Sequence, residues 1–349
     1  MMQVGEGGRK SVRSQSVITG RHAAAIVGLG KVALAIMIEA VKDNVVGIEI
    51  GGSKLQIVRG DPSGSITERF KFAVNPARGA GAIRDQIRQT LESIKAAHEI
   101  SAVGIGFGGP VEWQTGRICC SHHVAGWSQF DLAAWAGPIA GAPVVVDNDA
   151  NVAALGEARL GAGRNSNPVF YITLGSGVGG GLVVDGRIYH GAMPGEAEIG
   201  HVRLDRAGAT VESRCAGWAI DRRIRAAINE NPGCLLARLA DGRTGCEARH
   251  LKPALEKRDS MAIQILQDEA EDLAFALSHV THLFHPEAIV IGGGLSLLGE
   301  PLRAAVAEAL PRFVMDAFKP GPRVLLAALG EDAVPAGALV LAGLRRAEN

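Results

Sequence analysis

The residues best suited to chemistry lie in one short stretch, Val144–Asn151. The three valines at its start form a β-branched run that predicts a buried strand. Asp147, Asn148 and Asp149 follow, and an alanine-rich segment that predicts a helix comes next. Asn and Asp commonly cap helices, because their side-chain oxygens accept hydrogen bonds from N–H groups of the first turn. A carboxylate at the carboxyl end of a strand also lies where open α/β sheets bind ligands, and there it can accept a proton from a substrate hydroxyl. Alone, the stretch favours a simple helix cap.

Three glycine-rich segments favour a ligand site over isolated turns. The first, Gly51-Gly52-Ser53-Lys54, offers backbone N–H groups and a hydroxyl to a phosphate. The second is Gly175–Gly181 and the third is Gly292–Gly294, and each follows a predicted strand. Glycine lets a backbone approach a ligand closely. The first two clusters are not Walker A loops, since no Gly-Lys-Ser/Thr opens a helix. One such glycine turn would be an ordinary hairpin. Three of them, together with the polar residues Asp147–Asp149 at the end of the valine strand, predict a nucleotide-binding cleft.

Length, charge and cysteine content limit the class of protein. With 349 residues the chain is long enough for two domains, each with its own core. The formal net charge of +0 argues against a broad surface for nucleic acid or for an anionic membrane. The five cysteines are odd in number and form no CxxC pair, which favours a reducing cytoplasm without a disulfide framework.

Residues 1–43 differ from the rest of the chain. Basic residues precede an apolar stretch at 23–40 that Lys31 interrupts. No small-residue cleavage site follows, and the stretch is marginal in length for a membrane span. Gly28-Leu29-Gly30 lacks the third glycine of a dinucleotide loop. We expect a poorly ordered arm with one helix at most, which carries no chemistry.

From Val45 onward, strand and helix patterns alternate. Residues 80–98, for example, have apolar side chains at helical spacing. Strands are expected at 45–50, 55–58, 69–74, 102–107, 144–146, 168–174, 182–184, 187–189, 288–291 and 323–328, and helices at 80–98, 130–140, 216–230, 260–284, 296–313, 334–347 and from 152 onward.

Taken together, these motifs resemble those of the ROK family of repressors, open reading frames and kinases. The matching segments, in the family's order, are Gly47–Lys54, Asn148–Asn151 with Ala154–Glu157, Leu174–Gly181, Glu198–His201 and Ile291–Gly294. The resemblance implies an α/β fold of the actin-like ATPase (ribonuclease-H-like) type, with two domains flanking a cleft. The smaller domain would hold 44–147 and the C-terminal helix at 331–349, and the larger would hold 148–330.

The resemblance also implies a role for each motif residue. Asp149 would be the general base that takes the proton from a sugar hydroxyl as the hydroxyl attacks the γ-phosphate of ATP. Mg²⁺ would accompany ATP and face Glu49, which stands where the family usually has Asp. The sugar-binding residues would be Gly108, Gly109, Asn148, Glu198, His201 and Glu212. The nucleotide-binding residues would be Glu49, Gly51, Gly52, Ser53, Lys54, Gly175, Ser176, Gly177, Gly179, Gly292, Gly293 and Gly294.

The chain departs from the family at a metal-binding segment. Members of the family commonly carry a cysteine-rich zinc loop after the histidine, but residues 202–212 contain no cysteine. Structural zinc needs four nitrogen or sulfur ligands, and His201 alone remains, so we expect no zinc. Cys215 would then be a packing residue. For His279, His282 and His285, spaced three apart, a packed or solvent-edge helix face is favoured over a metal site, while His122-His123 is a weak candidate for sugar specificity.

The function implied is that of an ATP-dependent sugar kinase, with glucokinase the favoured member. The partners would be a small-molecule sugar and a nucleotide, without nucleic acid or membrane, and the family-level expectation is a homodimer. An N-acetylhexosamine kinase or a fructokinase is the alternative within enzymes. A non-catalytic sugar sensor or repressor is the other class, although residues 1–43 are too short for the usual winged DNA-binding module. The sequence leaves the sugar, and the choice between ATP and polyphosphate, open.

Overall fold

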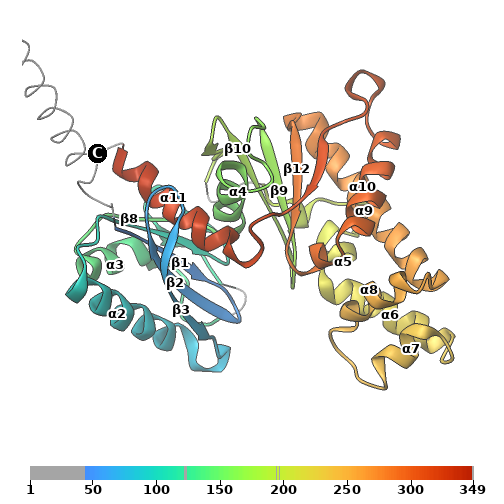
Figure 1. Cartoon of the computed structure of the whole chain (residues 1–349), viewed down its shortest axis with the longest axis horizontal. Coiled ribbons are helices and arrows are strands. Elements are labelled where there is room, and N and C mark those ends of the chain that lie inside the picture. The colour runs from blue at the N-terminus through green and yellow to red at the C-terminus, as the bar shows by residue number, and fades with distance from the viewer. Residues whose placement is uncertain (1–43, 122–123, 194, 196, 348–349) are drawn as a thin grey trace, which may run out of the picture. The chain divides into compact units, whose positions relative to one another are not determined.

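The computed structural model describes residues 44–121, 124–193, 195 and 197–347 (Figure 1). The arm expected at 1–43 and the pair His122-His123 lie outside the described residues. The described residues belong to one compact unit, Asp43–Asn349. The predicted boundary between two domains at 147/148 therefore stays a prediction. Within the described part of the chain, no helix has both the length and the apolar character needed to cross a bilayer.

The first sheet places the ends of three parallel strands at one edge. Its strands are β1 (Val45–Ile50), β2 (Lys54–Gly60), β3 (Ile66–Ala73), β4 (Ala102–Phe107) and β8 (Val144–Asn148). Their order is β3-β2-β1-β4-β8, with β1 antiparallel to β2 and parallel to β4, and β4 parallel to β8. The carboxyl ends of β1, β4 and β8 consequently meet, and the predicted residues at 49–54, 108–109 and 147–149 follow from these ends.

One layer of helices covers the first sheet through an apolar face. In α2 (Gly79–Ala97), Ile83, Ile87 and Leu91 recur at helical spacing and join a core with Ile48 and Ile105. The helix α3 (Leu132–Ala140) packs into the same core. A three-stranded sheet that the sequence did not predict consists of β5 (Val111–Glu112), β6 (Arg117–Ile118) and β7 (Phe130–Asp131).

The second sheet contains part of the glycine cluster that was expected to be a loop. Its strands are β9 (Val169–Leu174), β10 (Val178–Val184), β11 (Arg187–Ile188), β12 (Ala288–Gly292) and β13 (Arg323–Leu326), in the order β11-β10-β9-β12-β13. Gly179, Gly180 and Gly181 pair within β10 against β9. A Cβ added to Gly181 would lie 2.7 Å from Ala154 Cβ, so these glycines allow a helix to pack closely on the strand.

The other face of the second sheet is covered by further helices and short turns. The 25-residue helix α9 contributes the largest apolar face to this core. Three short helices, α5, α7 and α8, were not predicted. The elements are η2 (Ile199–His201), α5 (Val211–Cys215), α6 (Gly217–Glu230), α7 (Leu235–Ala240), η3 (Glu247–His250), α8 (Leu251–Glu256), α9 (Ser260–Phe284), η4 (Gly294–Leu298), α10 (Glu300–Ala309), η5 (Leu310–Arg312), η6 (Asp316–Phe318) and η7 (Gly330–Asp332).

Two helices connect the sheets, α4 (Asp149–Arg159) and α11 (Ala333–Ala347). α11 packs on α4, β1 and β4, while α4 also contacts β9 and β10 (Figure 1). α11 approaches strands β1 and β4 closely because the strand residues at the contact are glycines. A Cβ on Gly47 would lie 2.7 Å from the carbonyl oxygen of Pro335, and one on Gly104 would meet the carbonyl of Ala338. α11 therefore returns the end of the described chain to the first sheet.

Candidate active site

Asn148 caps the helix that carries the predicted base. Its Oδ1 accepts hydrogen bonds from the backbone N–H groups of Ala150 (2.9 Å) and Asn151 (3.3 Å). Its Nδ2 donates to the carbonyl oxygen of Gly109 at 3.1 Å. The helix consequently begins at Asp149, three residues earlier than expected. The cap interpretation is correct for Asn148, and the same side chain ties the helix to the 108–109 turn.

Asp149 lies in a partly buried position next to a second carboxylate. A Cβ on Gly108 would lie 3.3 Å from Asp149 Oδ2 and 3.7 Å from Gly51 Cα, which places the glycine turn at 51–54 beside the predicted base. Burial, and then the negative charge of Glu49, raise the pKa of Asp149 to about 7. Glu49 is buried and accepts hydrogen bonds from Lys54 Nζ (2.9 Å) and Gln56 Nε2 (2.7 Å). Two carboxylates thus lie close together beside the glycine turn at 51–54.

The raised pKa of Asp149 predicts a pH-dependent gain in stability for the Asp149→Asn variant. The pKa is about 7 in the folded protein against 3.8 for an unperturbed aspartate, so between these values only the folded state keeps the proton. The wild type therefore loses stability as pH rises from about 4 to 7, by at most about 1.4 kcal/mol per pKa unit. Asn cannot ionise, so the variant avoids the cost of burying the Asp149 carboxylate charge at high pH. Thermal melting should show a larger stabilisation by Asp149→Asn at pH 8 than at pH 4.5, and an equal difference at both would contradict the shift.

A narrow pocket adjoins Asn148. Glu198, exposed at the start of η2, contributes to its wall together with Trp113 and Asp147. The pocket is narrow, about 10 Å³, which is room for one water. Among the described residues, the pocket is lined by Pro110, Val111, Trp113, Asp147, Asn148, Asn151, Gly195 and Glu198. The sequence offered no signal for Trp113, since only the fold brings it to this wall.

Two of the predicted sugar-binding residues lie elsewhere. His201 ends η2 and is exposed, outside the residues that line this pocket. Glu212, in α5, accepts a hydrogen bond from Val178 N through Oε2 at 3.0 Å. The same oxygen would lie 2.8 Å from a Cβ on Gly177. Glu212 therefore holds the glycine turn that precedes β10, and contact of Glu212 or His201 with a sugar stays a prediction.

The remaining two glycine segments meet in a larger pocket of about 580 Å³. Gly217 N donates to Gly175 O at 2.8 Å, and a Cβ on Gly293 would lie 2.6 Å from the backbone of Leu174. Trp218 (44% exposed) and Leu297 (73%) present apolar surface in this pocket. In the part of the chain that the structure describes, the lining is Leu174, Gly175, Ser176, Gly217, Trp218, Asp221, Cys246, Ala248, Arg249, Lys252, Gly294, Leu295, Leu297 and Leu298. An aromatic face and glycine backbone suit a nucleoside, and sequence reasoning missed Trp218.

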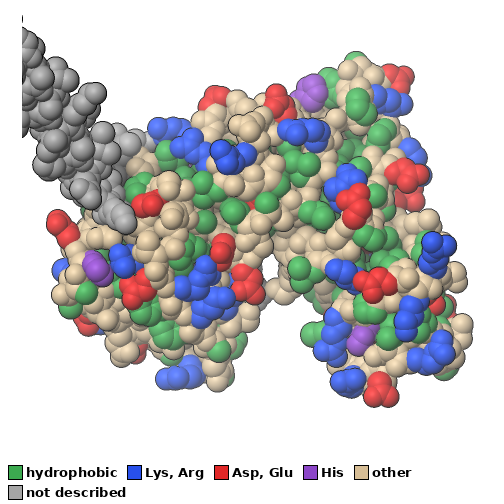
Figure 2. Space-filling view, viewed as in Figure 1, with side chains coloured by type: hydrophobic (Ala, Val, Ile, Leu, Met, Phe, Trp, Pro, Cys, Tyr) green, Lys and Arg blue, Asp and Glu red, His purple; other side chains and the backbone are tan. Residues whose placement is uncertain are grey.

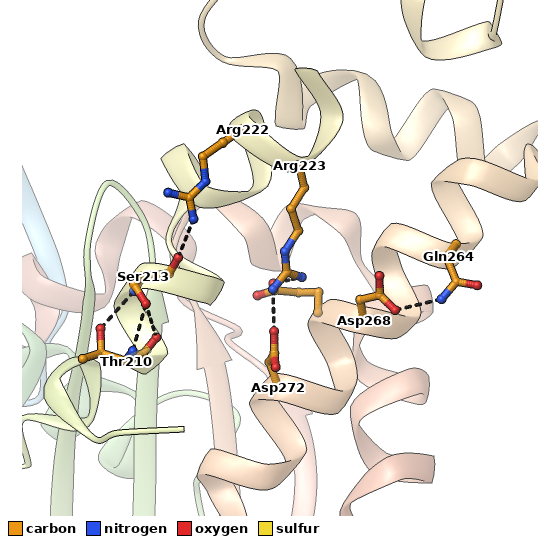
Figure 3. Close-up of polar contacts among 8 residues, drawn as sticks. Thr210, Ser213, Arg222, Arg223, Gln264, Asp268 and Asp272 are labelled. Carbon is orange, nitrogen blue, oxygen red and sulfur yellow. Dashed lines mark hydrogen bonds and ion pairs between the residues drawn. The ribbon is translucent and has the colours of Figure 1, made fainter. Parts of the chain in front are cut away.

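Hydrogen bonds hold α5, and an ion-pair network joins the neighbouring helices α6 and α9 (Figure 3). Thr210 Oγ1 accepts from Ser213 N at 3.2 Å and Ser213 Oγ accepts from Thr210 N at 2.8 Å, a reciprocal cap. Arg222 donates to Ser213 O at 3.1 Å, as the dashed line in Figure 3 marks. Arg223 pairs with Asp272 and with the buried Glu269. The hydrogen bonds therefore tie α5 to α6, and the ion pairs tie α6 to α9.

The core beneath this network agrees with the packing role expected for Cys215, which is buried. Burial raises the pKa of the Cys215 thiol and raises the pKa of Glu269 to about 8. The histidines of α9 also have packing partners. His285 stacks on Phe318 with ring centroids 4.0 Å apart, and His282 Nε2 accepts from Met315 N at 3.1 Å. Both histidines are exposed while they make these contacts, which agrees with the solvent-edge form of the expected helix face.

Chelation is expected to leave the protein folded. His201 has no cysteine near it in sequence, and no group of three or more His, Cys, Asp or Glu side chains within the described residues is placed to hold a metal ion. Incubation with EDTA should therefore leave the melting temperature unchanged, and elemental analysis should find no stoichiometric zinc. One zinc per chain, lost together with a fall in melting temperature, would contradict this prediction.

Comparisons with known proteins identify the family. Residues 45–344 match the model of the ROK family. The chain is 31% identical over 302 residues to a glucokinase of Halalkalibacterium halodurans, covering 82% of this chain and 91% of the relative. It is 32% identical over 309 residues to a glucokinase of Streptomyces coelicolor, covering 85% and 96%. The protein belongs to the ROK family.

A solved structure gives the same fold. It is a ROK family glucokinase from Streptomyces griseus in complex with glucose and AMPPNP, with a TM-score of 0.75 and 32% identity over 86% of this chain and 99% of that one. A ROK hexokinase from Thermus thermophilus gives a TM-score of 0.74 at 26% identity, covering 88% of this chain and 100% of that chain. The predicted α/β fold of the actin-like ATPase type is confirmed.

Proposed function

We propose that this protein is an ATP-dependent glucokinase that transfers the γ-phosphoryl group of ATP to the 6-hydroxyl of glucose. The position of Asp149 carries the proposal. It opens α4 beside the glycine turn at 51–54 and directly follows Asn148, which lines the narrow pocket. Four relatives that match 82–85% of this chain at 29–32% identity are glucokinases, and the similar solved structure contains glucose and AMPPNP. Site geometry and relatives thus agree on one reaction class.

Asp149 would orient the sugar hydroxyl and accept its proton. Phosphoryl transfer depends mainly on positioning and on the stabilisation of charge, so a base fixed in the first turn of a helix suits it. With a pKa of about 7, Asp149 matches the pH at which such a base works best. The backbone of the turn at 51–54 would cradle the phosphates, and the aromatic face of Trp218 would support the adenine.

Mg²⁺ fits the residues near Asp149. Mg²⁺ prefers oxygen ligands and usually binds through one or two carboxylates together with substrate phosphates and waters. Glu49 and Asp149 supply such oxygens, and their mutual repulsion is one cause of the raised pKa of Asp149. When bound with ATP, the ion would neutralise phosphate charge. Glu49, although longer than Asp, is already held in place by Lys54 and Gln56.

Trp218→Ala is expected to weaken nucleotide binding selectively. Loss of the indole removes a stacking surface that is worth about 1–3 kcal/mol per base in comparable contacts. The KM for ATP should rise about tenfold or more while the KM for glucose stays within twofold, and Trp218→Phe should restore most of the affinity. Steady-state kinetics with each substrate varied in turn measures this. An unchanged KM for ATP in Trp218→Ala would remove this pocket from nucleotide binding.

A coupled ADP-release assay tests the proposed function itself. The purified protein with Mg²⁺-ATP would be supplied with glucose, fructose, mannose, N-acetylglucosamine and N-acetylmannosamine, and polyphosphate would be offered as an alternative donor. A preference for glucose by tenfold or more in kcat/KM is the expected result. A preference for an amino sugar or fructose would reassign the substrate. Sugar binding by calorimetry without turnover would favour a non-catalytic sensor.

We propose further that the protein acts as a homodimer in a reducing cytoplasm, without nucleic acid or membrane as a partner. Leu283 (75% exposed), Phe284 (39%) and Tyr189 (47%) offer an apolar surface, and the rings of Tyr189 and Phe284 lie 6.4 Å apart. Figure 2 shows acidic and basic side chains intermixed on the visible face, which suits small-molecule substrates better than a polyanion. Light scattering of the purified protein measures the oligomeric state.

A further inference from the structure

His190 makes two contacts that connect different parts of the molecule. Its Nε2 lies 2.7 Å from Asp147 Oδ2, and its ring stacks on Trp113 with centroids 4.1 Å apart and planes inclined by 14°. Both side chains of the polar pair are largely buried, with 17% of His190 and 4% of Asp147 exposed. Trp113 and Asp147 both line the narrow pocket beside Asn148. His190 therefore supports two residues of the same wall from behind.

Asp147 depends on this contact. Its Oδ1 accepts hydrogen bonds from Asn148 N at 2.8 Å and from Asn151 Nδ2 at 3.0 Å. His190 supplies the donor to the other oxygen, Oδ2. A buried carboxylate that loses a donor pays the desolvation penalty of the unpaired oxygen, so it shifts toward water or toward another donor. Such a shift would move the Asn148 backbone, and with it the pocket wall and the start of the helix that carries Asp149.

The chain around His190 is also anchored. Tyr189 N donates to Leu182 O at 2.8 Å, so the residue before His190 is fixed to β10 of the second sheet. Asp147 belongs to β8 of the first sheet and Trp113 follows β5. The segment that leads from His190 to Glu198 thus begins at a point where the two sheets are joined through a side chain. None of the motif residues supplies this connection.

We propose that His190 is a positioning residue for the sugar pocket, which donates to Asp147 and supports Trp113 so that the wall keeps its sugar-binding shape. This inference rests on the proposed kinase function. His190 contacts no reacting atom in this role. It sets the affinity for the sugar and leaves the nucleotide pocket, which is built from 174–176, 217–218 and 294–298, unaffected.

The variants His190→Leu and His190→Gln separate the hydrogen bond from the bulk of the side chain. His190→Leu removes the donor, and we expect the KM for glucose to rise about tenfold or more with the KM for ATP within twofold. His190→Gln keeps a donor and a planar group, and its KM for glucose should stay within about threefold of wild type. His98→Leu, at the end of α2 and away from the pocket, is the control and should match wild type.

Calorimetric titration with glucose in the absence of ATP separates the two proposals. If wild type neither binds nor phosphorylates any hexose, the proposed function fails and the role of His190 fails with it. If wild type binds glucose and His190→Leu binds it within threefold of wild type, the inference about His190 alone is overturned. If His190→Leu does not fold, His190→Asn replaces it, because Asn is too short to reach Asp147. Equal sugar affinity in the Asn and Gln variants would then overturn the inference.

Discussion

Replacing Asp149 by Asn is expected to reduce kcat by about a thousandfold or more while sugar affinity stays within about tenfold of wild type. The amide keeps the size and most of the polarity of the side chain but accepts no proton from the sugar hydroxyl. Asp149 occupies the first turn of α4, where Asn148 forms the cap, so the substitution leaves the helix start intact. The substitution therefore weakens stabilisation of the transition state and leaves binding of the sugar in the ground state largely unchanged. Single-turnover kinetics and calorimetric titration with glucose measure the two effects separately.

An exposed aspartate provides the control for this experiment. Asp241→Asn changes the same functional group at a side chain that is 82% exposed, and it should leave kcat unchanged. The wild-type kcat/KM should also rise with pH through about 7, because only the carboxylate form of Asp149 can act as a base. Full turnover by Asp149→Asn would remove Asp149 from the mechanism and return it to the role of a helix-start residue.

Replacing Gly104 by Val should destabilise the fold more than any other single change considered above. A Cβ on Gly104 would meet the carbonyl of Ala338, with Ala338 C at 2.9 Å and Ala342 N at 3.1 Å, so α11 must move away from β4. These are backbone atoms of a helix and cannot rotate aside. Overpacking of this kind costs about 3 kcal/mol, which for a chain of this length corresponds to a fall of roughly 4–5 °C in melting temperature. Thermal denaturation followed by circular dichroism measures it.

The matched control for Gly104 is a glycine with space around it. No atom lies within 4 Å of a Cβ built on Gly81, which is in α2. Gly81→Ala should therefore keep or slightly raise the melting temperature, since Ala has the higher helix propensity. A fall of the same size in both variants would show that the close contact between α11 and β4 is not the cause.

The strands and the polar segment Asp147–Asp149 were predictable because local sequence patterns determine them. β1 and β4 begin and end at the expected residues, since each is a mostly apolar run bounded by glycine or polar residues. Asp149 was placed correctly beside a strand end for the same reason. The short helices α5, α7 and α8 span too few residues to show a helical period. Their positions depend on the core they cover.

The glycines and the pocket walls could be predicted only in part. A glycine that allows a helix to approach, as Gly181 does, has the same sequence signature as one that allows a ligand to approach. Gly179 likewise lies within β10, close to Ala150 of α4. Trp113, His190 and Trp218 belong to no motif, and each reaches its pocket through contacts between residues that are distant in sequence. The sequence therefore indicated the chemistry better than the walls around it.

The return of α11 to the first sheet has a consequence for biosynthesis. Val45 and Ala102 of β1 and β4 form a core cluster with Leu339 and Ala342 of α11. A ribosome that adds 5–20 residues per second needs on the order of ten seconds or more to proceed from β4 to α11. During this interval the apolar face of the nascent sheet has no cover. We therefore expect the first half of the chain to emerge as a client for chaperones and to complete its folding after α11 leaves the exit tunnel.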